Sequence, residues 1–365
     1  MYKKAKIILE TGQVFEGKSV GYDLSVQGEF VFTTGMTGFE LSLTDPSYKG
    51  QILVFTFPLI GNFGVASASR DEFGIVENFE SDQIHVNAVV CNNMSEDFSH
   101  HMAEKSFSDW LKEGKIPAIS EIDTRHLTQV LREKGALLGQ ILIEGDEEIV
   151  NLKDPNKKNL VAEVATKEVK IFEPKDYVKT ILAIDTGIKN NILRSFLKRG
   201  VRVILAPWDF DVANSELEFD GLFLSNGPGD PKVVYEVINK NIDFALSKNM
   251  PIFGICLGNQ VLSLAMGADT YKLDYGHRGA NQPCQDIHTK KCYITSQNHG
   301  FCVDGDTVPE DFEIWFKNLN DGSVEGIKHK TKPIYSVQFH PEAFAGPHDT
   351  GFLFDEFIAE LGKSL

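Results

Sequence analysis

Short runs of hydrophobic residues, separated by Gly and Asp, dominate roughly the first 145 positions of the chain. Runs of this length, rich in β-branched and aromatic residues, are typical of strands. The clearest runs cover residues 6–9, 29–33 and 51–57. Helices are expected at residues 103–113 and 124–134, the second with Asp123 as its N-cap and Gly135 just past its end. We therefore expect a β-rich, mixed N-terminal domain over residues 1–150.

From residue 180 onward, the pattern changes to strands that alternate with helices. The alternating segments cover residues 181–184, 190–198, 201–205, 221–224, 233–247 and 252–255. Such alternation is typical of βαβ units, in which helices join parallel strands. The sequence therefore predicts an α/β fold with a C-terminal doubly wound, mostly parallel sheet over residues 180–365.

A charged segment, residues 151–179, lies between these two patterns. It is rich in Lys and acidic residues and contains two Pro. Charge and proline disfavour a packed element, so we expect a solvated linker there.

Composition narrows the class of protein. The chain has 365 residues, of which 42% are hydrophobic and 24% charged, as is usual for a globular protein of about two domains. The net charge of −16 argues against nucleic acid or an anionic membrane as a partner. The longest apolar runs fall well short of the ~18 residues of a transmembrane helix. Five scattered cysteines do not suggest a disulfide framework, so we expect a reducing cytoplasm.

Residues 12–19 match, letter for letter, the G-x-x-x-x-G-K-[ST] pattern of phosphate-binding loops. Such a loop must lead into a helix, whose N-terminal amides help to hold the phosphates. Here Ser19 is followed by Val-Gly-Tyr-Asp, and Val14 and Phe15 suit a strand. We therefore predict a β-hairpin with two turn glycines and no nucleotide site.

A cluster of Cys and His residues invites comparison with a metal site. The cluster consists of His277, Cys284, His288, Cys292, His299 and Cys302. Its spacings match none of the paired ligand sets of structural zinc. We therefore expect strands with buried thiols and no metal.

The sharpest chemical signal is a Cys between two glycines. A short apolar run leads into Gly254, Cys256 and Gly258, followed by a helical stretch. This G-x-C-x-G pattern is that of a nucleophile elbow with Cys in place of Ser. The following helix N-terminus favours a thiolate, and the N–H of Leu257 points to where an oxyanion would form. Gln260 shares a helix face with Cys256.

A thiolate nucleophile needs a base, and the base needs a group to orient it. The predicted strand at residues 333–339 runs into His340 and, two residues later, Glu342. Cys256 and His340 both follow predicted strands, and sites in doubly wound sheets form at that edge. On the residues alone, His299 and His277 remain rival bases. Residues 225–230 are a further glycine-containing loop that follows a predicted strand. Its backbone amides could form the other half of an oxyanion hole.

Together, three ordered motifs resemble the class I, triad-type glutamine amidotransferase domain over residues 180–365. The motifs are Ser-Asn-Gly-Pro-Gly-Asp, Gly-Ile-Cys-Leu-Gly-Asn-Gln and Phe-His-Pro-Glu. The resemblance implies Cys256 as the nucleophile, His340 as the base and Glu342 as the residue that orients it.

Further segments resemble the small, glutamine-hydrolysing subunit of carbamoyl-phosphate synthetase across nearly the whole chain. These segments are residues 37–40, 44–48, 58–62, 123–125, 275–281 and 296–301. The resemblance implies that glutamine is bound by Ser47, Gly227, Gly229, Leu257, Gln260, Asn298, Gly300 and Phe301. One departure is Asn259, where the family motif usually carries His before the Gln.

The resemblance also implies a reaction and a partner. Cys256 would attack the glutamine carboxamide, amides of Leu257 and Gly229 would hold the oxyanion, and His340 would protonate the departing ammonia. The ammonia would pass to a large subunit that makes carbamoyl phosphate from bicarbonate and ATP for arginine and pyrimidine synthesis. No cofactor or metal is expected on this chain, because ATP and Mg²⁺ would bind the large subunit.

Three alternatives come from other classes of protein. A free-standing cysteine hydrolase would not need a β-rich N-terminal domain. A catalytically silent interaction subunit would not need the Cys, His and Glu set. Another amidotransferase, serving GMP, CTP or anthranilate synthesis, would lack the N-terminal segments above.

Overall fold

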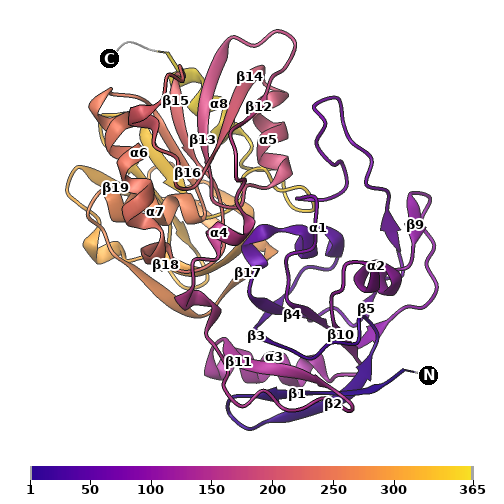
Figure 1. Ribbon diagram of the computed structural model, residues 1–365. Coiled ribbons are helices and arrows are strands. Elements are labelled where there is room, and N and C mark those ends of the chain that lie inside the picture. Colours follow the sequence, from indigo (N-terminus) through magenta and orange to yellow (C-terminus); the bar gives the residue numbers. More distant parts are fainter. Residues whose placement is uncertain (1, 363–365) are drawn as a thin grey trace. The chain divides into compact units, whose positions relative to one another are not determined.

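The computed structural model describes residues 2–362, which form two compact units (Figure 1). The first unit contains the chain up to Asp71, residues Val76–Lys158 and the short segment Asp274–Arg278. The second contains Glu72–Ile75, Asn159–Leu273 and the chain from Gly279 onward. Each unit is described by itself below.

Seven strands of the first unit form a closed barrel in the order β1-β11-β3-β4-β7-β10-β2. The strands are β1 (Lys4–Leu9), β2 (Val14–Ser19), β3 (Val26–Thr33), β4 (Gln51–Phe55), β7 (Ala88–Val90), β10 (Ala118–Ser120) and β11 (Leu137–Ile143). Pairing is parallel from β3 through β4 and β7 to β10, and antiparallel elsewhere. The β-rich prediction thus takes the specific form of a barrel, whose closure removes exposed sheet edges.

Short elements surround the barrel. They are α1 (Phe39–Thr44), η1 (Pro46–Tyr48), β5 (Leu59–Ile60), β6 (Val65–Ala66), β8 (Asn93–Met94), β9 (Ala103–Lys105), α2 (Phe107–Glu113) and α3 (Thr124–Lys134). All of β4 is buried, and its side chains alternate between two clusters. Ile52 and Val54 share a cluster with Leu127 of α3, whereas Leu53 joins the cluster that contains Phe107 of α2. The first five residues of the apolar run at 51–57 therefore form a central strand that is buried on both faces.

The helix predicted at residues 124–134 is confirmed, including its cap. The Asp123 carboxylate accepts a hydrogen bond from the His126 N–H at 2.9 Å, and Gly135 follows the helix with φ 89°. The other predicted helix begins later than expected. Ser106 caps α2 by accepting from the Asp109 N–H, and residues 103–105 form β9 instead.

The segment that matches a phosphate-binding loop is a hairpin, as predicted, but only Gly12 lies in the turn, because Gly17 lies within β2 and pairs with Ala5. β2 pairs antiparallel with β1, and Gly12 takes φ 83° in the turn between them. Lys18 lies on the outer face of β2 and forms an ion pair with Glu121 at 2.7 Å. Since Ser19 leads into no helix, the amides that would hold a phosphate are missing from this segment.

The second unit is built on a ten-stranded sheet in the order β12-β14-β13-β15-β16-β21-β20-β18-β17-β19. Its strands are β12 (Lys170–Phe172), β13 (Lys179–Asp185), β14 (Val201–Pro207), β15 (Gly221–Leu224), β16 (Ile252–Ile255), β17 (Thr270–Asp286), β18 (Cys292–Val303), β19 (Phe312–Asn318), β20 (Val324–His329) and β21 (Ile334–Val337). Pairing is parallel from β14 to β21. β12 at one edge and β20 at the other begin antiparallel extensions.

Helices cover both faces of the parallel strands (Figure 1). α5 (Asn190–Leu197) and α8 (Phe352–Glu360) pack on one face, and α6 (Tyr235–Ser247) and α7 (Leu257–Ala265) pack on the other. Short 3₁₀ turns complete the unit at η3 (Val212–Asn214), η4 (Pro231–Val233) and η5 (Gly305–Thr307). A mixed α/β protein is therefore confirmed, but the sheet is not mostly parallel as predicted, because antiparallel strands extend it on both sides of its parallel centre. The long polar strands β17 and β18 extend it with antiparallel pairs.

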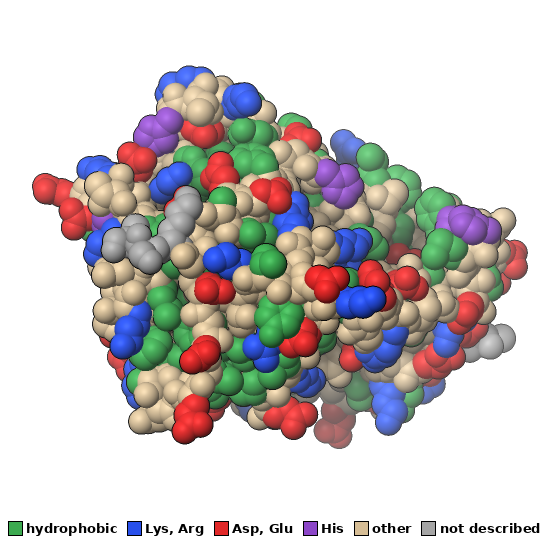
Figure 2. All heavy atoms as spheres, turned by 90° about the horizontal axis from the view of Figure 1, so that it is seen from above, with side chains coloured by type: hydrophobic (Ala, Val, Ile, Leu, Met, Phe, Trp, Pro, Cys, Tyr) green, Lys and Arg blue, Asp and Glu red, His purple; other side chains and the backbone are tan. Residues whose placement is uncertain are grey.

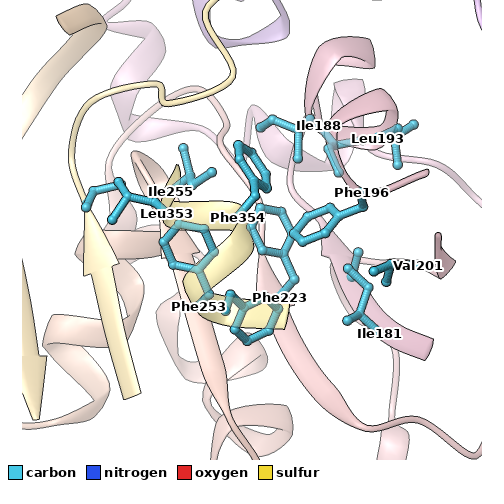
Figure 3. Packing of buried hydrophobic residues seen from close by; sticks show 14 of the residues in the cluster. Ile181, Ile188, Leu193, Phe196, Val201, Phe223, Phe253, Ile255, Leu353 and Phe354 are labelled. Carbon is cyan, nitrogen blue, oxygen red and sulfur yellow. The ribbon is translucent and has the colours of Figure 1, made fainter. Parts of the chain in front are cut away.

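Aromatic side chains fill the core between the sheet and the helices α5 and α8 (Figure 3). The Phe196 ring meets Phe223 and Phe354 edge to face, with ring centroids 5.0 Å apart in both pairs. Edge-to-face packing of this kind contributes about 1 kcal/mol per pair beyond area burial. This core fixes β15 and β16, the strands that lead into the candidate site.

The segment predicted to be a solvated linker, residues 151–179, contains structure of its own. It holds η2 (Pro155–Lys157), α4 (Val161–Val164) and β12. Val161 and Ala165 are buried in the cluster beneath α6 and α7, and β12 pairs with β14. The segment is not solvated throughout, as its many lysines had suggested, because a few apolar residues among them pack into the core.

The surface charges and the length of the helices concern the partners that the sequence analysis disfavoured, nucleic acid and membranes. On the face shown in Figure 2, acidic and basic side chains are interspersed. Among residues 2–362, no helix combines the length and the apolar character needed to cross a membrane.

Candidate active site

Cys256 lies in the sharp turn between β16 and α7. Its backbone takes φ 56° and ψ −105°, a strained conformation for a residue with a Cβ. Such conformations cost about 1–3 kcal/mol and persist only where the surroundings enforce them. Here the Cys256 N–H donates to the Val337 carbonyl at 2.9 Å, and the Gln260 N–H donates to the Cys256 carbonyl at 3.2 Å.

The two glycines beside Cys256 allow α7 to approach the sheet. A Cβ on Gly254 would lie 2.6 Å from the Gly258 carbonyl oxygen. A Cβ on Gly258 would lie 2.2 Å from the Leu224 carbonyl oxygen. Both contacts are with backbone and far too short, so the G-x-C-x-G pattern is a steric requirement of this elbow.

The Cys256 thiol is enclosed, and the amino end of a helix lies beside it. Its side chain is buried, and Sγ donates to the Asn298 carbonyl at 3.6 Å. α7 begins at the next residue, so its unpaired amides and dipole stabilise negative charge on the sulfur. The position therefore suits a thiolate nucleophile.

His340 and Glu342 form a buried pair at the end of β21. The two side chains join through His340 Nδ1 and Glu342 Oε1 at 2.8 Å, and His340 is only 1% exposed. With its Nδ1 proton held by the carboxylate, the neutral ring presents an unprotonated Nε2. That Nε2 is buried and has no hydrogen-bond partner among the residues that the structure describes. The ring is thus prepared to take a proton at Nε2.

Strand pairing brings the thiol and the imidazole to one edge of the sheet. Ile255 of β16 pairs with Val337 of β21, so Cys256 and His340 both follow the ends of neighbouring parallel strands. β18 contacts both residues, because Ser296 bridges to the His340 backbone and the Asn298 carbonyl meets Cys256 Sγ. This edge is where sites form in open α/β sheets.

Lys189 belongs to the same cluster, although the sequence analysis missed it. Its Nζ lies 3.0 Å from Glu342 Oε1, and both side chains are buried. Burial alone would raise the pKa of Glu342, but the charge of Lys189 and the interaction with His340, including its hydrogen bond, outweigh burial and lower the pKa to about 2. Asn191 adds a hydrogen bond from Nδ2 to the Glu342 carbonyl. A signal was present, because Lys189 follows β13 at the same edge of the sheet.

The loop at residues 225–230 is held rigidly after β15. Ser225 and Asn226 are fully buried, and the Thr186 N–H donates to Ser225 Oγ at 2.9 Å. A Cβ on Gly227 would lie 2.1 Å from the Thr186 carbonyl oxygen, and Gly229 takes φ 87°. Both glycines are therefore required for the loop's shape.

The other predicted glutamine-binding residues divide between the two units. Gln260 Nε2 donates to the Phe301 carbonyl at 2.8 Å, so α7 and the strand that carries Asn298, Gly300 and Phe301 are in contact. Ser47 lies in η1 of the first unit, where its N–H donates to Asp45 Oδ1 at 2.9 Å.

The rival bases differ from His340 in their surroundings. Both ring nitrogens of His299 are engaged, Nδ1 with the Phe301 carbonyl at 2.8 Å and Nε2 with Gln297 Oε1 at 3.1 Å. His277 belongs to the first unit. Within the second unit, the geometry therefore favours His340 over His299.

The cysteines once compared with zinc ligands are free thiols. Cys284 and Cys302 are buried as predicted, and burial raises the pKa of Cys302 to about 12. Cys292 differs from the prediction, because it is exposed. A protonated, buried thiol is a poor metal ligand, so Cys302 gives no support to a metal site.

Comparisons with known proteins match both halves of the chain. Residues 7–141 match the family described as carbamoyl-phosphate synthase small chain, CPSase domain. Residues 182–360 match glutamine amidotransferase class-I. The two matches follow the order of the barrel and the sheet along the chain.

Individual relatives agree with these matches. The chain is 47% identical to the carbamoyl phosphate synthase arginine-specific small chain of Eremothecium gossypii, covering 98% of this chain and 92% of that protein. It is 49% identical to multifunctional protein pyr1-3 of Dictyostelium discoideum and 50% identical to multifunctional protein CAD of Squalus acanthias. These matches cover 98% and 97% of this chain but only 17% and 16% of the two longer proteins. The chain therefore belongs to the carbamoyl-phosphate synthase small-chain family and carries a class-I glutamine amidotransferase domain.

Proposed function

We propose that this chain hydrolyses glutamine at Cys256 and supplies the released ammonia to the large chain of a carbamoyl-phosphate synthase. The observation that carries the proposal is the strained Cys256 elbow at the same sheet edge as a buried His340–Glu342 pair, whose Nε2 has no partner among residues 2–362. A nucleophile, a base and a group that orients the base are what acyl transfer through a thioester requires.

The first half of the reaction forms the thioester. His340 Nε2 takes the thiol proton, and the Cys256 thiolate attacks the carboxamide carbon of glutamine. The N–H groups of Leu257 and Gly229 donate to the oxyanion that develops. The C–N bond then breaks, and the imidazolium gives its proton to the leaving ammonia.

The second half releases glutamate. His340 takes a proton from a water molecule that attacks the γ-glutamyl thioester, and the proton then returns to the Cys256 sulfur as the C–S bond breaks. Glu342 keeps the ring in the correct tautomer and stabilises the imidazolium. Lys189 keeps Glu342 ionised, in line with the lowered pKa of that carboxyl.

Substrate binding, on this proposal, uses backbone and side chains from several elements. The glutamine contacts are Ser47, Gly227, Gly229, Leu257, Gln260, Asn298, Gly300 and Phe301. Residues 180–365 act as the glutaminase domain, residues 1–150 form the part specific to the small chain, and residues 151–179 connect them.

The partner, on this proposal, is a large chain that binds ATP and Mg²⁺ and uses bicarbonate, so this chain needs no cofactor of its own. On this proposal the product serves arginine and pyrimidine synthesis, and the name of one relative, an arginine-specific small chain, supports the first of these roles. Five free thiols favour a reducing compartment, and we place the protein in the cytoplasm.

A paired assay tests the proposal. Purified chain and large chain are mixed, and carbamoyl phosphate is measured with glutamine or with ammonium salt as the nitrogen source. We expect synthesis from glutamine only when both chains are present, and synthesis from ammonia with the large chain alone. Glutamate release that never leads to carbamoyl phosphate would instead indicate a free-standing hydrolase.

A further inference from the structure

Three buried carboxamides lie together beside the candidate nucleophile. Asn259 and Gln260 belong to the first turn of α7, and Gln338 follows β21, two residues before His340. None of the three is more than 2% exposed. Asn259 Nδ2 and Gln260 Nε2 both lie 3.1 Å from the same atom, Gln338 Oε1. One side chain therefore holds two consecutive residues of the catalytic helix.

The donors and acceptors of this cluster fit in one way, which leaves Gln338 Nε2 without a hydrogen-bond partner among residues 2–362. The Phe301 carbonyl can only accept, so Gln260 must turn its Nε2 toward it at 2.8 Å. The same Nε2 then faces Gln338, which must present its oxygen. Asn259 also donates to that oxygen, which leaves Asn259 Oδ1 to accept from Ser336 Oγ at 2.9 Å. The backbone carbonyl of Phe301 thus sets the orientation of every amide in the cluster.

This arrangement fixes the free end of Gln260. Both N–H groups of its amide are used inside the protein, one on Phe301 and one on Gln338. The Gln260 Oε1 accepts no hydrogen bond from residues 2–362. It is therefore left as an acceptor for a donor group of the substrate, and it cannot exchange places with Nε2 while Gln338 holds the amide.

Asn259 meets the same requirement that a histidine would meet. Its amide donates to Gln338 and accepts from Ser336. A neutral imidazole likewise offers one donor and one acceptor on opposite sides of the ring. The asparagine that departs from the usual family motif thus preserves the pattern of donors and acceptors around Gln338.

We infer that Gln338 is a positioning residue for glutamine binding, acting through Gln260. Its carbonyl oxygen locks the Gln260 amide with Oε1 directed to the substrate, and Asn259 holds Gln338 in place. The inference rests on the proposed role of Gln260 as a glutamine contact. Removing the Gln338 oxygen should weaken binding of glutamine and leave the chemical step at Cys256 nearly intact.

Steady-state glutaminase kinetics of the assembled complex test this inference. In Gln338→Leu, we expect the KM for glutamine to rise about tenfold, while kcat changes less than threefold. Gln338→Glu keeps an oxygen acceptor, so its KM should stay within about threefold of wild type. Synthesis from ammonia should match wild type in both variants, which shows that they fold and assemble.

Asn241→Leu is the matched control. Asn241 is also a buried carboxamide with two hydrogen bonds, from the Val212 N–H at 3.1 Å and to the Phe210 carbonyl at 2.8 Å, but it lies on α6. Its loss should lower stability without changing the KM. An equal rise of KM in Asn241→Leu and Gln338→Leu would overturn the inference, because it would show a general effect of buried amide loss.

Gln260→Ala separates this inference from the proposed function. If Gln260→Ala raises the KM, adding Gln338→Leu should raise it no further, because Gln338 acts through Gln260. A wild-type KM in Gln338→Leu, additive effects in the double variant, or equal effects of Gln338→Leu and Gln338→Glu would overturn the role of Gln338 alone. A wild-type KM in Gln260→Ala would overturn the inference together with that glutamine contact. Absence of glutamine hydrolysis in the wild-type complex would overturn the function itself.

Discussion

Two glycine-flanked segments of this chain match motifs of catalytic or nucleotide-binding loops, yet only one has the geometry of a site. Gly12 to Ser19 forms the β1–β2 hairpin, whereas Gly254 to Gly258 forms a strand-to-helix elbow. In the hairpin, the Lys18 side chain pairs with Glu121 on the outer face of the barrel. In the elbow, a strained Cys256 lies at the N-terminus of α7. The element that follows the glycines, rather than their spacing, decides what the segment can do.

The largest expected effect is on the elbow's thiol. Cys256→Ala should lower glutamine hydrolysis by about 10⁶-fold, because covalent nucleophiles of triad enzymes contribute that much. Synthesis from ammonia should persist in the complex, since the fold is unchanged. Hydrolysis at the normal rate in Cys256→Ala would show that another group is the nucleophile.

The next largest effect on turnover is expected at Glu342, which pairs with Lys189 and orients His340. Glu342→Gln should lower turnover by about 10²–10⁴-fold, because the ring keeps its nitrogens but loses the carboxylate that orients it. Initial rates at saturating glutamine give the comparison. An effect as large as that of Cys256→Ala would mean that Glu342 takes a direct part in the chemistry.

Lys189→Met should change the acid side of the pH profile. The pKa of Glu342 is lowered to about 2, so the ion pair supports the site at neutral pH and is lost only as the pH falls from about 4.5 toward 2. Without the charge of Lys189, the pKa of Glu342 should be less strongly lowered, and the loss of turnover should begin at a higher pH. Rates measured between pH 4 and pH 8 would show the shift, and an unchanged acid limb would contradict the role given to Lys189.

Replacing one glycine in the elbow and one in the hairpin by alanine compares how much room each segment has for a side chain. Gly258→Ala should cost about 3 kcal/mol, because its Cβ would lie 2.2 Å from the Leu224 carbonyl oxygen. Gly12→Ala should cost about 1 kcal/mol, because the only penalty is a side chain at φ 83°, with no heavy atom within 4 Å of its Cβ. Urea unfolding of both variants measures the difference, and equal costs would show that the elbow can relax.

The smallest effect is expected at the hairpin's lysine. Lys18→Ala removes a surface ion pair, worth about 0–1 kcal/mol, and should leave glutaminase activity within twofold of wild type. Binding of ATP to the isolated chain is the direct measurement. Tight binding that depends on Lys18 would show that the hairpin is a phosphate-binding loop after all.

Much of the site could be predicted from local patterns in the sequence. The turn at Cys256 and the strand end before His340 were predicted because apolar runs, glycines and a proline mark them in short windows. The limits of α3 were predicted for the same reason, since its capping residue is adjacent in the chain. Lys189 was missed because its contact with Glu342 spans 342 − 189 = 153 positions, and its place after a strand end indicates the edge of the sheet but not this partner.

Other features depend on distant pairings. The barrel closes where β1 pairs with β11, which joins Ala5 to Ile143, and neither strand alone indicates closure. The antiparallel extension of the sheet depends on β20 pairing with β21. In the sequence, Gln338 is an ordinary residue of a predicted strand, and only the fold shows that Asn259 and Gln260 both donate to it.

The most direct test of the account is the rate at which a glutamine analogue with an electrophilic side-chain carbon alkylates Cys256. His340 is the only group given the task of activating the thiol, whereas both nitrogens of His299 are already engaged. We predict that His340→Asn slows labelling of Cys256 by at least about 100-fold, as loss of a general base should, and that His299→Asn leaves the rate close to wild type. Labelling at the wild-type rate in His340→Asn, together with its failure in His299→Asn, would contradict the account and identify His299 as the base.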